Sequence, residues 1–309
     1  MLQITDLSKS FGNRMAVKGV SFHVKRGELF GLLGPNGAGK STVISMICGL
    51  LQPDQGDVLV DGLSVQKQPV KVKEKIGVVP QDIALYGDMS ALDNLLFWGQ
   101  MYGLSRKNAL KKAEDVLEVV GLADRKKEKL AGFSGGMKRR INIGAAIMHE
   151  PELLIMDEPT VGIDPQSRNH ILEMVKSFNA KGVTVIYTSH YMEEVEYLCS
   201  RIAIMDEGEI IALGTKEELV SRLIGVSSME LKVDRVSETL VEDIKKIPGV
   251  TQVTREEEGL TIFAENPKER LGDVVLAAKG QGVAVTSLEV KEPNLETLFL
   301  TITGRKLRD

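Results

Sequence analysis

The stretch that decides the fold is GPNGAGKST, residues 34–42, which follows the apolar run LFGLL (29–33) and opens the segment KSTVISMICGLL (40–51). This order predicts a buried strand, a glycine-rich loop and a helix. Glycines at positions 34, 37 and 39 let backbone N–H groups surround an anion without obstruction by Cβ atoms, and the helix N-terminus adds positive potential. The stretch therefore predicts a site for the phosphates of a nucleoside triphosphate.

The side chains of this loop are also suited to phosphate binding. Lys40 can reach the β- and γ-phosphates, the Ser41 hydroxyl can ligate Mg²⁺, and Thr42 can donate to a phosphate oxygen. A glycine-rich turn without a ligand is the alternative, but the strand–loop–helix context favours the phosphate site. The predicted nucleotide-binding residues of the loop are Gly34, Pro35, Asn36, Gly37, Ala38, Gly39, Lys40, Ser41 and Thr42.

Two adjacent carboxylates end a second apolar run, ELLIMDE at residues 152–158. Open α/β sheets bind their ligands at the carboxyl ends of such strands. There, Asp157 can hold Mg²⁺, directly or through water, and Glu158 can orient or deprotonate an attacking water. An isolated Asp-Glu pair would be explained by a turn; together with the glycine-rich loop it indicates a nucleotide-hydrolysing site.

A second candidate anion site is the sequence FSGGM, residues 133–137. Ser134 is a suitable N-cap, and two glycines and an amphipathic segment follow it. A helix N-terminus with bare backbone can bind a phosphate, although an ordinary capped turn explains the same residues. If both sites bind phosphate, a head-to-tail pair of chains is a simple way to use them together.

Length and composition limit the function classes. The 309 residues are enough for two domains, and the net charge of −4 gives no basic stripe of the kind that nucleic-acid binders carry. Cys48 and Cys199 lie far apart and are expected to be free thiols. No secretory signal and no run of about 20 apolar residues is present, so if the protein works at a membrane we expect another chain to span it.

Two domains are expected, covering residues 1–220 and 221–309. The first is predicted to be α/β, with antiparallel edge strands before residue 30, a mostly helical region at about 82–150, and a βαβ unit that includes the runs at 152–158 and 183–189. The second reads as βαββαβ plus a terminal helix, which fits a small ferredoxin-like α+β domain. It carries no recognisable catalytic constellation.

Over roughly residues 1–220 the chain resembles the ATP-binding cassette (ABC) ATPases. The resemblance implies a P-loop ABC fold with a mixed core sheet, an antiparallel edge sheet and a helical subdomain, and it implies ATP and Mg²⁺ as ligands. The motifs that carry it are, in chain order, GPNGAGKST, Gln81 in VVPQD, FSGGM, LLIMDEP, GIDP and TSH.

The resemblance also assigns roles to individual residues. Phe11 is expected to stack on adenine, and His190 to contact the γ-phosphate. Ser134, Gly135 and Gly136 form the signature that acts on the partner's nucleotide, while Asp164 is the D-loop acid. The residues expected to act in catalysis are Lys40, Gln81, Glu158 and His190, with Glu158 as the base, and those expected to hold Mg²⁺ are Ser41, Gln81 and Asp157.

Three positions depart from the usual family pattern. Phe133 and Met137 replace the leucine and glutamine of the common LSGGQ signature, and Phe11 replaces a tyrosine. The serine and both glycines of the signature are kept, so hydrolysis is still expected. Phe11 keeps the aromatic ring and loses only the hydroxyl.

The variant FSGGMKRR and the tail EPNLETLFLTITGR (292–305) resemble the ABC-2 exporter branch, which includes daunorubicin-resistance and sodium-export ATPases. This implies an ATPase subunit of an exporter of drugs, lipids, polysaccharide or ions. It would act as an ATP-dependent homodimer on a separate permease at the inner face of the cell membrane, with no nucleic acid partner. The aromatic-rich segment 84–103 would transmit motion to the permease, unless its rings pack inside the helical region.

Three alternatives stay open at this point. The chain could be an importer ATPase, or a soluble ABC ATPase that serves translation or DNA maintenance without a permease. Residues 221–309 could form a regulatory or dimerising module.

Overall fold

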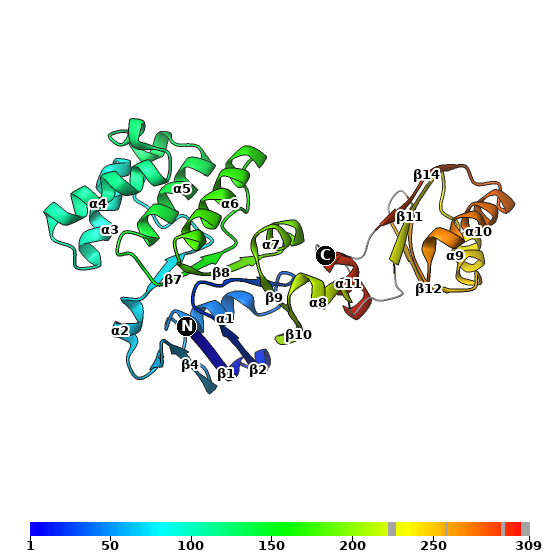
Figure 1. The fold of residues 1–309 in the computed structure, drawn as a ribbon, viewed down its shortest axis with the longest axis horizontal. Coiled ribbons are helices and arrows are strands. Elements are labelled where there is room, and N and C mark those ends of the chain that lie inside the picture. Colours follow the sequence, from blue (N-terminus) through cyan, green and yellow to red (C-terminus); the bar gives the residue numbers. More distant parts are fainter. Residues whose placement is uncertain (222–226, 257–258, 292–293, 304–309) are drawn as a thin grey trace. The chain divides into compact units, whose positions relative to one another are not determined.

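The computed structural model describes residues 1–221, 227–256, 259–291 and 294–303. It contains two compact units, the first covering Met1–Thr215 and the second starting at Lys216 (Figure 1). The sequence placed this boundary at residues 220/221. The segment 222–226 and parts of the predicted exporter-type tail (292–293 and 304–305) lie outside the described residues.

The core of the first unit is a six-stranded sheet in the order β10-β9-β3-β8-β7-β6. Neighbouring strands from β9 to β6 run parallel, whereas β10 pairs antiparallel with β9, so the sheet is mixed as expected. The central strands are buried along their length, which explains their continuous apolar runs. The strands are β3 Leu29–Leu33, β6 Ile76–Val79, β7 Leu153–Asp157, β8 Thr184–Ser189, β9 Arg201–Asp206 and β10 Glu209–Gly214.

A second, antiparallel sheet has the order β2-β1-β4-β5. Its apolar residues share one core with β3 and the following helix, and the rings of Phe22 and Phe30 stack at 5.1 Å between centroids. This packing holds the loop after β3 beneath the β1–β2 hairpin. The strands are β1 Leu2–Phe11, β2 Arg14–Val24, β4 Gln55–Val60 and β5 Leu63–Ser64.

The helices that follow β6 lie together in Figure 1, coloured cyan to green. α3, α4 and α5 begin at serine N-caps, and α6 begins at Asp164, whose side chain accepts the Ser167 N–H. None of the helices in the described residues is long and apolar enough to cross a bilayer. The helices of the first unit are α1 Lys40–Ile47, α2 Pro69–Lys73, α3 Ala91–Met101, α4 Arg106–Val119, η1 Ala123–Arg125, η2 Leu130–Gly132, α5 Gly135–Ala146, α6 Pro165–Ala180 and α7 Met192–Leu198.

The second unit contains a four-stranded antiparallel sheet in the order β12-β13-β11-β14. This is the strand order of a ferredoxin-like βαββαβ unit, and α9 and α10 contribute Leu240, Ile244 and Val274 to its core. The elements are α8 Lys216–Ser221, β11 Ser227–Val233, α9 Glu238–Lys245, β12 Val250–Arg255, β13 Gly259–Ala264, α10 Pro267–Gly280, β14 Val285–Lys291 and α11 Leu295–Thr303.

Candidate active site

The loop between β3 and α1 requires glycine at two close approaches. Gly39 has φ +103°, and a Cβ atom on it would lie 2.6 Å from the Ala16 carbonyl oxygen. A Cβ atom on Gly34 would lie 2.4 Å from the carbonyl oxygen of Met205. A larger residue at either position would force the backbone apart, so the loop conformation depends on these glycines.

Lys40 lies inside this loop, with only 4% of its surface exposed. Its Nζ donates to the carbonyl oxygens of Gly34 (2.7 Å) and Pro35 (3.1 Å). It also lies 3.3 Å from Oε1 of Glu158. The buried ammonium is therefore compensated by two carbonyls and one carboxylate, as a buried charge requires.

The two carboxylates at the end of β7 are held by a threonine on the neighbouring strand β8. The Thr188 hydroxyl donates to Oδ1 of Asp157 (2.6 Å) and accepts the backbone N–H of Glu158 (2.9 Å). Glu158 has φ +44°, a left-handed conformation that is uncommon for a residue other than glycine. Such backbone strain clusters at functional sites, where the surrounding structure enforces it.

His190 follows directly after β8, and its Nδ1 lies 3.1 Å from Oε2 of Glu158. Lys40 and His190 thus contact the two oxygens of one carboxylate, which is itself only 6% exposed. These three residues come from segments far apart in the sequence. They meet because β3, β7 and β8 are parallel neighbours whose carboxyl ends share one edge of the sheet.

The oxygen donors beside this cluster suit Mg²⁺. Oδ2 of Asp157 has no hydrogen-bond partner in the described part of the chain, and Ser41 is exposed at the start of α1. No group of three or more His, Cys, Asp or Glu side chains within the described residues could hold a metal ion without other ligands. Mg²⁺ is commonly held by one or two protein oxygens together with substrate phosphates, so the residues present fit this ion.

The predicted signature forms a second cluster. Ser134 caps α5 by accepting the Met137 N–H at 3.3 Å. Gly136 packs against the start of α6, where a Cβ atom would lie 2.4 Å from Cβ of Ser167. Asp164 accepts the Ser167 N–H at 2.9 Å, and this bond lowers the pKa of the Asp164 carboxyl. The signature and the D-loop acid are thus neighbours within one chain.

Gln81 and Phe11 occupy the edges of this region. The side chain of Gln81 is exposed, and the backbone carbonyl of Gln81 accepts a 2.6 Å hydrogen bond from the buried Arg139. Phe11 is 53% exposed and pairs across the β1–β2 hairpin with Arg14. Nη2 of Arg14 is the nearest atom, at 3.8 Å, to the position a Cβ would take on Gly37. The hairpin therefore brings Arg14, the strand partner of Phe11, close to the phosphate loop.

The structure thus joins Lys40, Asp157, Glu158 and His190 in one cluster and Ser134, Gly136 and Asp164 in another. Among the described residues, no hydrogen bond or ion pair links the first cluster to the second. The three remaining histidines lie elsewhere: His23 and His170 are exposed, and His149 is half-buried and stacks on Tyr102.

Comparison with known proteins decides the family. The sequence model of the "ABC transporter" family matches residues 17–161. The chain is 56% identical to "Linearmycin resistance ATP-binding protein LnrL" of Bacillus subtilis (strain 168), over 100% of both chains. It is 35% identical to "Nod factor export ATP-binding protein I" of Burkholderia lata, over 100% of this chain and 98% of that one.

The chain belongs to the ABC transporter ATP-binding proteins.

Solved ABC cassettes agree with this assignment. The ATP-binding subunit of an ABC transporter has a TM-score of 0.66 and 31% identity, covering 72% of this chain and 93% of that one. Another ATP-binding cassette, solved as a dimer in a post-hydrolysis state with ADP and Pi, has a TM-score of 0.64 and 26% identity, covering 70% of this chain and 98% of that one. The predicted P-loop ABC fold is confirmed, and the chain is an ATP-hydrolysing subunit of the exporter type.

The sequence did not predict a buried polar network centred on Glu194, close to His190 in the chain. The Glu194 side chain is fully buried on α7, and its Oε2 accepts hydrogen bonds from Thr160 (2.8 Å), Tyr187 (2.9 Å) and Ser189 (3.0 Å). Its Oε1 lies 2.6 Å from Nε of Arg168 on α6. Burial and the adjacent carboxylate raise the pKa of Tyr187, so its hydroxyl stays protonated and donates.

This network connects the segments on both sides of His190 with the start of α6. Ser189 also accepts the Tyr191 N–H at 2.9 Å, and the Tyr191 ring lies 4.1 Å from the His190 ring. Both chain neighbours of His190 are therefore fixed in place: Ser189 by the buried network, and Tyr191 by its hydrogen bond to Ser189. A hint in the sequence was the acidic Glu194 within the otherwise apolar face of the helix after TSH.

Proposed function

We propose that this chain works as an ATP-driven homodimer on a separate membrane permease, and that the assembly exports linearmycin or a chemically related compound. The observation that carries the proposal is the 56% identity to the linearmycin resistance ATP-binding protein over the whole of both chains. The permease would hold the chain at the cytoplasmic face of the membrane. At 35% identity, the Nod factor export proteins are weaker guides to the cargo.

In this proposal two copies meet head to tail and share each ATP. The phosphates lie on the P-loop of one copy and on Ser134, Gly135 and Gly136 of the other, where a helix N-terminus and bare backbone favour a phosphate. Two observations support this sharing. No hydrogen bond or ion pair joins the two clusters within the described part of the chain, and the chain is similar to a cassette solved as a dimer in a post-hydrolysis state. Phe11 would stack on the adenine.

Glu158 would act as the general base. It takes a proton from water while the water oxygen attacks the γ-phosphorus and the bond to the β-phosphate oxygen breaks. Its carboxylate contacts Lys40 and His190, the two groups expected to bind the γ-phosphate, and these contacts support the proposed role. Bound Mg²⁺ would neutralise phosphate charge, with Ser41, Gln81 and Asp157 as the residues that would hold it.

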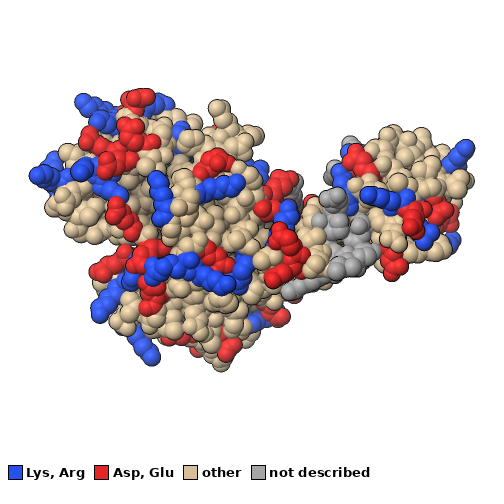
Figure 2. Space-filling view, viewed as in Figure 1, with Lys and Arg blue, Asp and Glu red and all other residues tan. Residues whose placement is uncertain are grey.

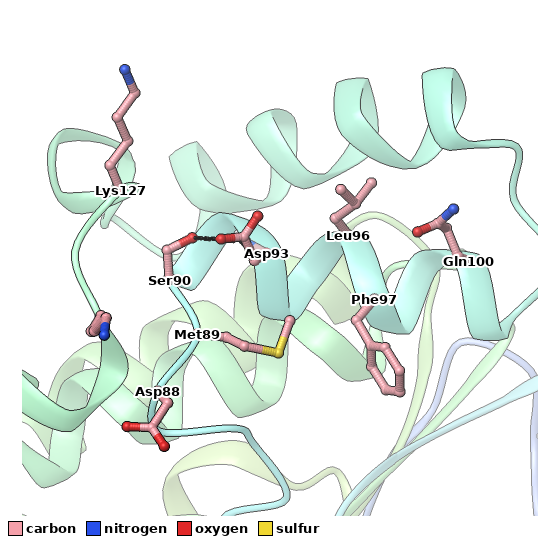
Figure 3. Close-up of a pocket in the computed structure, with 9 residues that line it drawn as sticks. Asp88, Met89, Ser90, Asp93, Leu96, Phe97, Gln100 and Lys127 are labelled. Atoms are coloured by element: carbon pink, nitrogen blue, oxygen red, sulfur yellow. Dashed lines mark hydrogen bonds between the residues drawn. The ribbon is translucent and has the colours of Figure 1, made fainter.

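The permease would dock on the helical region that follows Gln81. Tyr86 is 50% exposed there, and the half-buried Phe97 meets the Tyr86 ring edge-on at 5.1 Å. Figure 3 shows the neighbouring pocket, in which Met89 and Phe97 lie below α3 and Lys127 extends from the facing loop. An apolar permease helix with charged ends would suit these groups.

The proposal is tested in the organism that carries this gene. Deletion of the gene should lower the linearmycin concentration that stops growth. Wild-type protein should restore growth, and so should Leu276→Ala, which removes a side chain that is exposed in the second unit. Tyr86→Ala/Phe97→Ala should not restore it, although the purified variant keeps its ATPase activity. Unchanged linearmycin sensitivity after deletion would refute the proposed cargo.

The soluble-ATPase alternative has weaker support, because the net charge of −4 gives no excess of basic residues for binding a nucleic acid. Figure 2 shows acidic and basic side chains interspersed on the visible face of the first unit. Tight, salt-dependent binding of the purified protein to ribosomes or DNA would revive this alternative. The importer alternative has no comparable support, because the chain is similar to Nod factor export proteins along its whole length.

A further inference from the structure

Arg125, the last residue of η1, contacts both residues by which the signature departs from LSGGQ. Its guanidinium carbon lies 4.9 Å from the centroid of the Phe133 ring, within cation–π range. Its Nη1 donates to Sδ of Met137 at 3.2 Å. The two unusual residues are thus coupled through one cation.

Glu128 fixes the orientation of this cation. Nε of Arg125 lies 2.9 Å from both carboxylate oxygens of Glu128, and these bonds raise the pKa of Arg125. The backbone N–H of Glu128 in turn donates to the Arg125 carbonyl at 3.0 Å. Because a guanidinium is planar, a carboxylate on one edge directs the remaining N–H groups toward Met137.

Of the residues between these two contacts, Gly136 packs against Ser167 on α6, whereas Gly135 has open space around it. A Cβ atom on Gly135 would meet nothing within 4 Å, and the same holds for Gly132 just before Phe133. Ser134 is held by its own capping bond to the Met137 N–H. Phe133 is 5% exposed and precedes Ser134, and Met137 follows it, so the two Arg125 contacts lie on both flanks of Ser134.

We propose that Arg125 is a positioning residue for the signature: it holds Phe133 and Met137 so that Ser134, Gly135 and Gly136 present their N–H groups to the ATP of the partner chain. This inference rests on the proposed sharing of ATP between two chains. It also explains why the two departures from LSGGQ occur together, since each supplies one of the Arg125 contacts.

The test uses full-length protein in the Glu158→Gln background, with dimer formation followed by light scattering as ATP is titrated. Arg125→Ala should raise the ATP concentration for half-maximal dimer formation about tenfold, through loss of the cation–π and hydrogen-bond contacts. Arg125→Lys keeps the charge and loses the planar fork. It should therefore raise the same ATP concentration by most of the factor seen with Arg125→Ala. Arg106→Ala, an exposed arginine at the start of α4, is the control and should change nothing.

Two further readouts separate positioning from general damage. Binding of ATP to the monomer should stay unchanged in Arg125→Ala, because the P-loop is intact. The second readout uses a Phe133→Leu/Met137→Gln background, which restores LSGGQ. There, Arg125→Ala should raise the ATP concentration for half-maximal dimer formation less than about twofold, because both contact partners of Arg125 are absent.

The outcomes are distinct. If Arg125→Ala raises the ATP concentration for dimer formation equally in both backgrounds, or in neither, the positioning role is overturned while the shared site stays intact. A Glu158→Gln parent that never dimerises with ATP would overturn the shared site, and this inference with it.

Discussion

A Glu158→Gln protein should bind ATP as tightly as the wild type and hydrolyse it about 10²–10⁴-fold more slowly. Glutamine has the shape of glutamate, so the close contacts to Lys40 and His190 can be kept. It cannot accept a proton from water at neutral pH, so the attacking water stays unactivated.

Phosphate release measures the turnover, and equilibrium binding of labelled ATP measures the affinity. Nucleotide extracted from the variant after incubation should be ATP rather than ADP. Glu193→Gln is the matched control, because Glu193 is an exposed glutamate on α7, and it should keep wild-type turnover. Wild-type turnover in Glu158→Gln would refute the general-base role.

Lys40→Ala should impair both binding and turnover. A charged hydrogen bond contributes about 1.5–3 kcal/mol, so ATP affinity should fall by roughly 10–100-fold. Loss of a positive donor from the transition state should lower turnover by on the order of 10²–10³-fold. The substitution also leaves the carbonyls of Gly34 and Pro35 without their donor and the buried Glu158 without its cation.

The same two assays check this prediction, with Lys107→Ala as the control because Lys107 is exposed on α4. The contrast between the variants is informative in itself. Glu158→Gln should change turnover alone, whereas Lys40→Ala should change both quantities. Unaltered ATP affinity in Lys40→Ala would contradict the place given to Lys40 in the phosphate site.

Local sequence patterns predicted much of this fold. A continuous apolar run, glycines at fixed offsets and a lysine at the helix start are sufficient to predict the β3–loop–α1 unit, because each feature acts within a few residues. The order of elements after residue 227 likewise predicts a ferredoxin-like unit, and the strand order β12-β13-β11-β14 agrees with it.

The rest depended on contacts between distant segments. Thr188 holds Asp157 and Glu158 from a strand about 30 residues away, and no local pattern marks a threonine in an apolar strand as a partner of carboxylates. The left-handed backbone of Glu158 has no sequence signal either, because glutamate rarely adopts it. Arg125 stands in the basic run RKKEK (125–129), a pattern typical of a solvated helix face, and only the structure places its side chain on the signature.

The measurement that tests the shared ATP site most directly is a cross-link between two differently tagged chains. Both chains carry Glu158→Gln with Cys48→Ala and Cys199→Ala, which removes the two native cysteines. One chain then carries Asn36→Cys in the exposed part of its P-loop, and the other carries Gly135→Cys, where a side chain meets nothing within 4 Å.

With ATP and a short thiol cross-linker, a shared ATP site should give a covalent product that contains both tags, and no such product should form without ATP. Each chain has a single cysteine, so this product can form only when the signature of one copy reaches the P-loop of the other. A mixture that binds ATP fully and still gives no doubly tagged product would contradict the shared site.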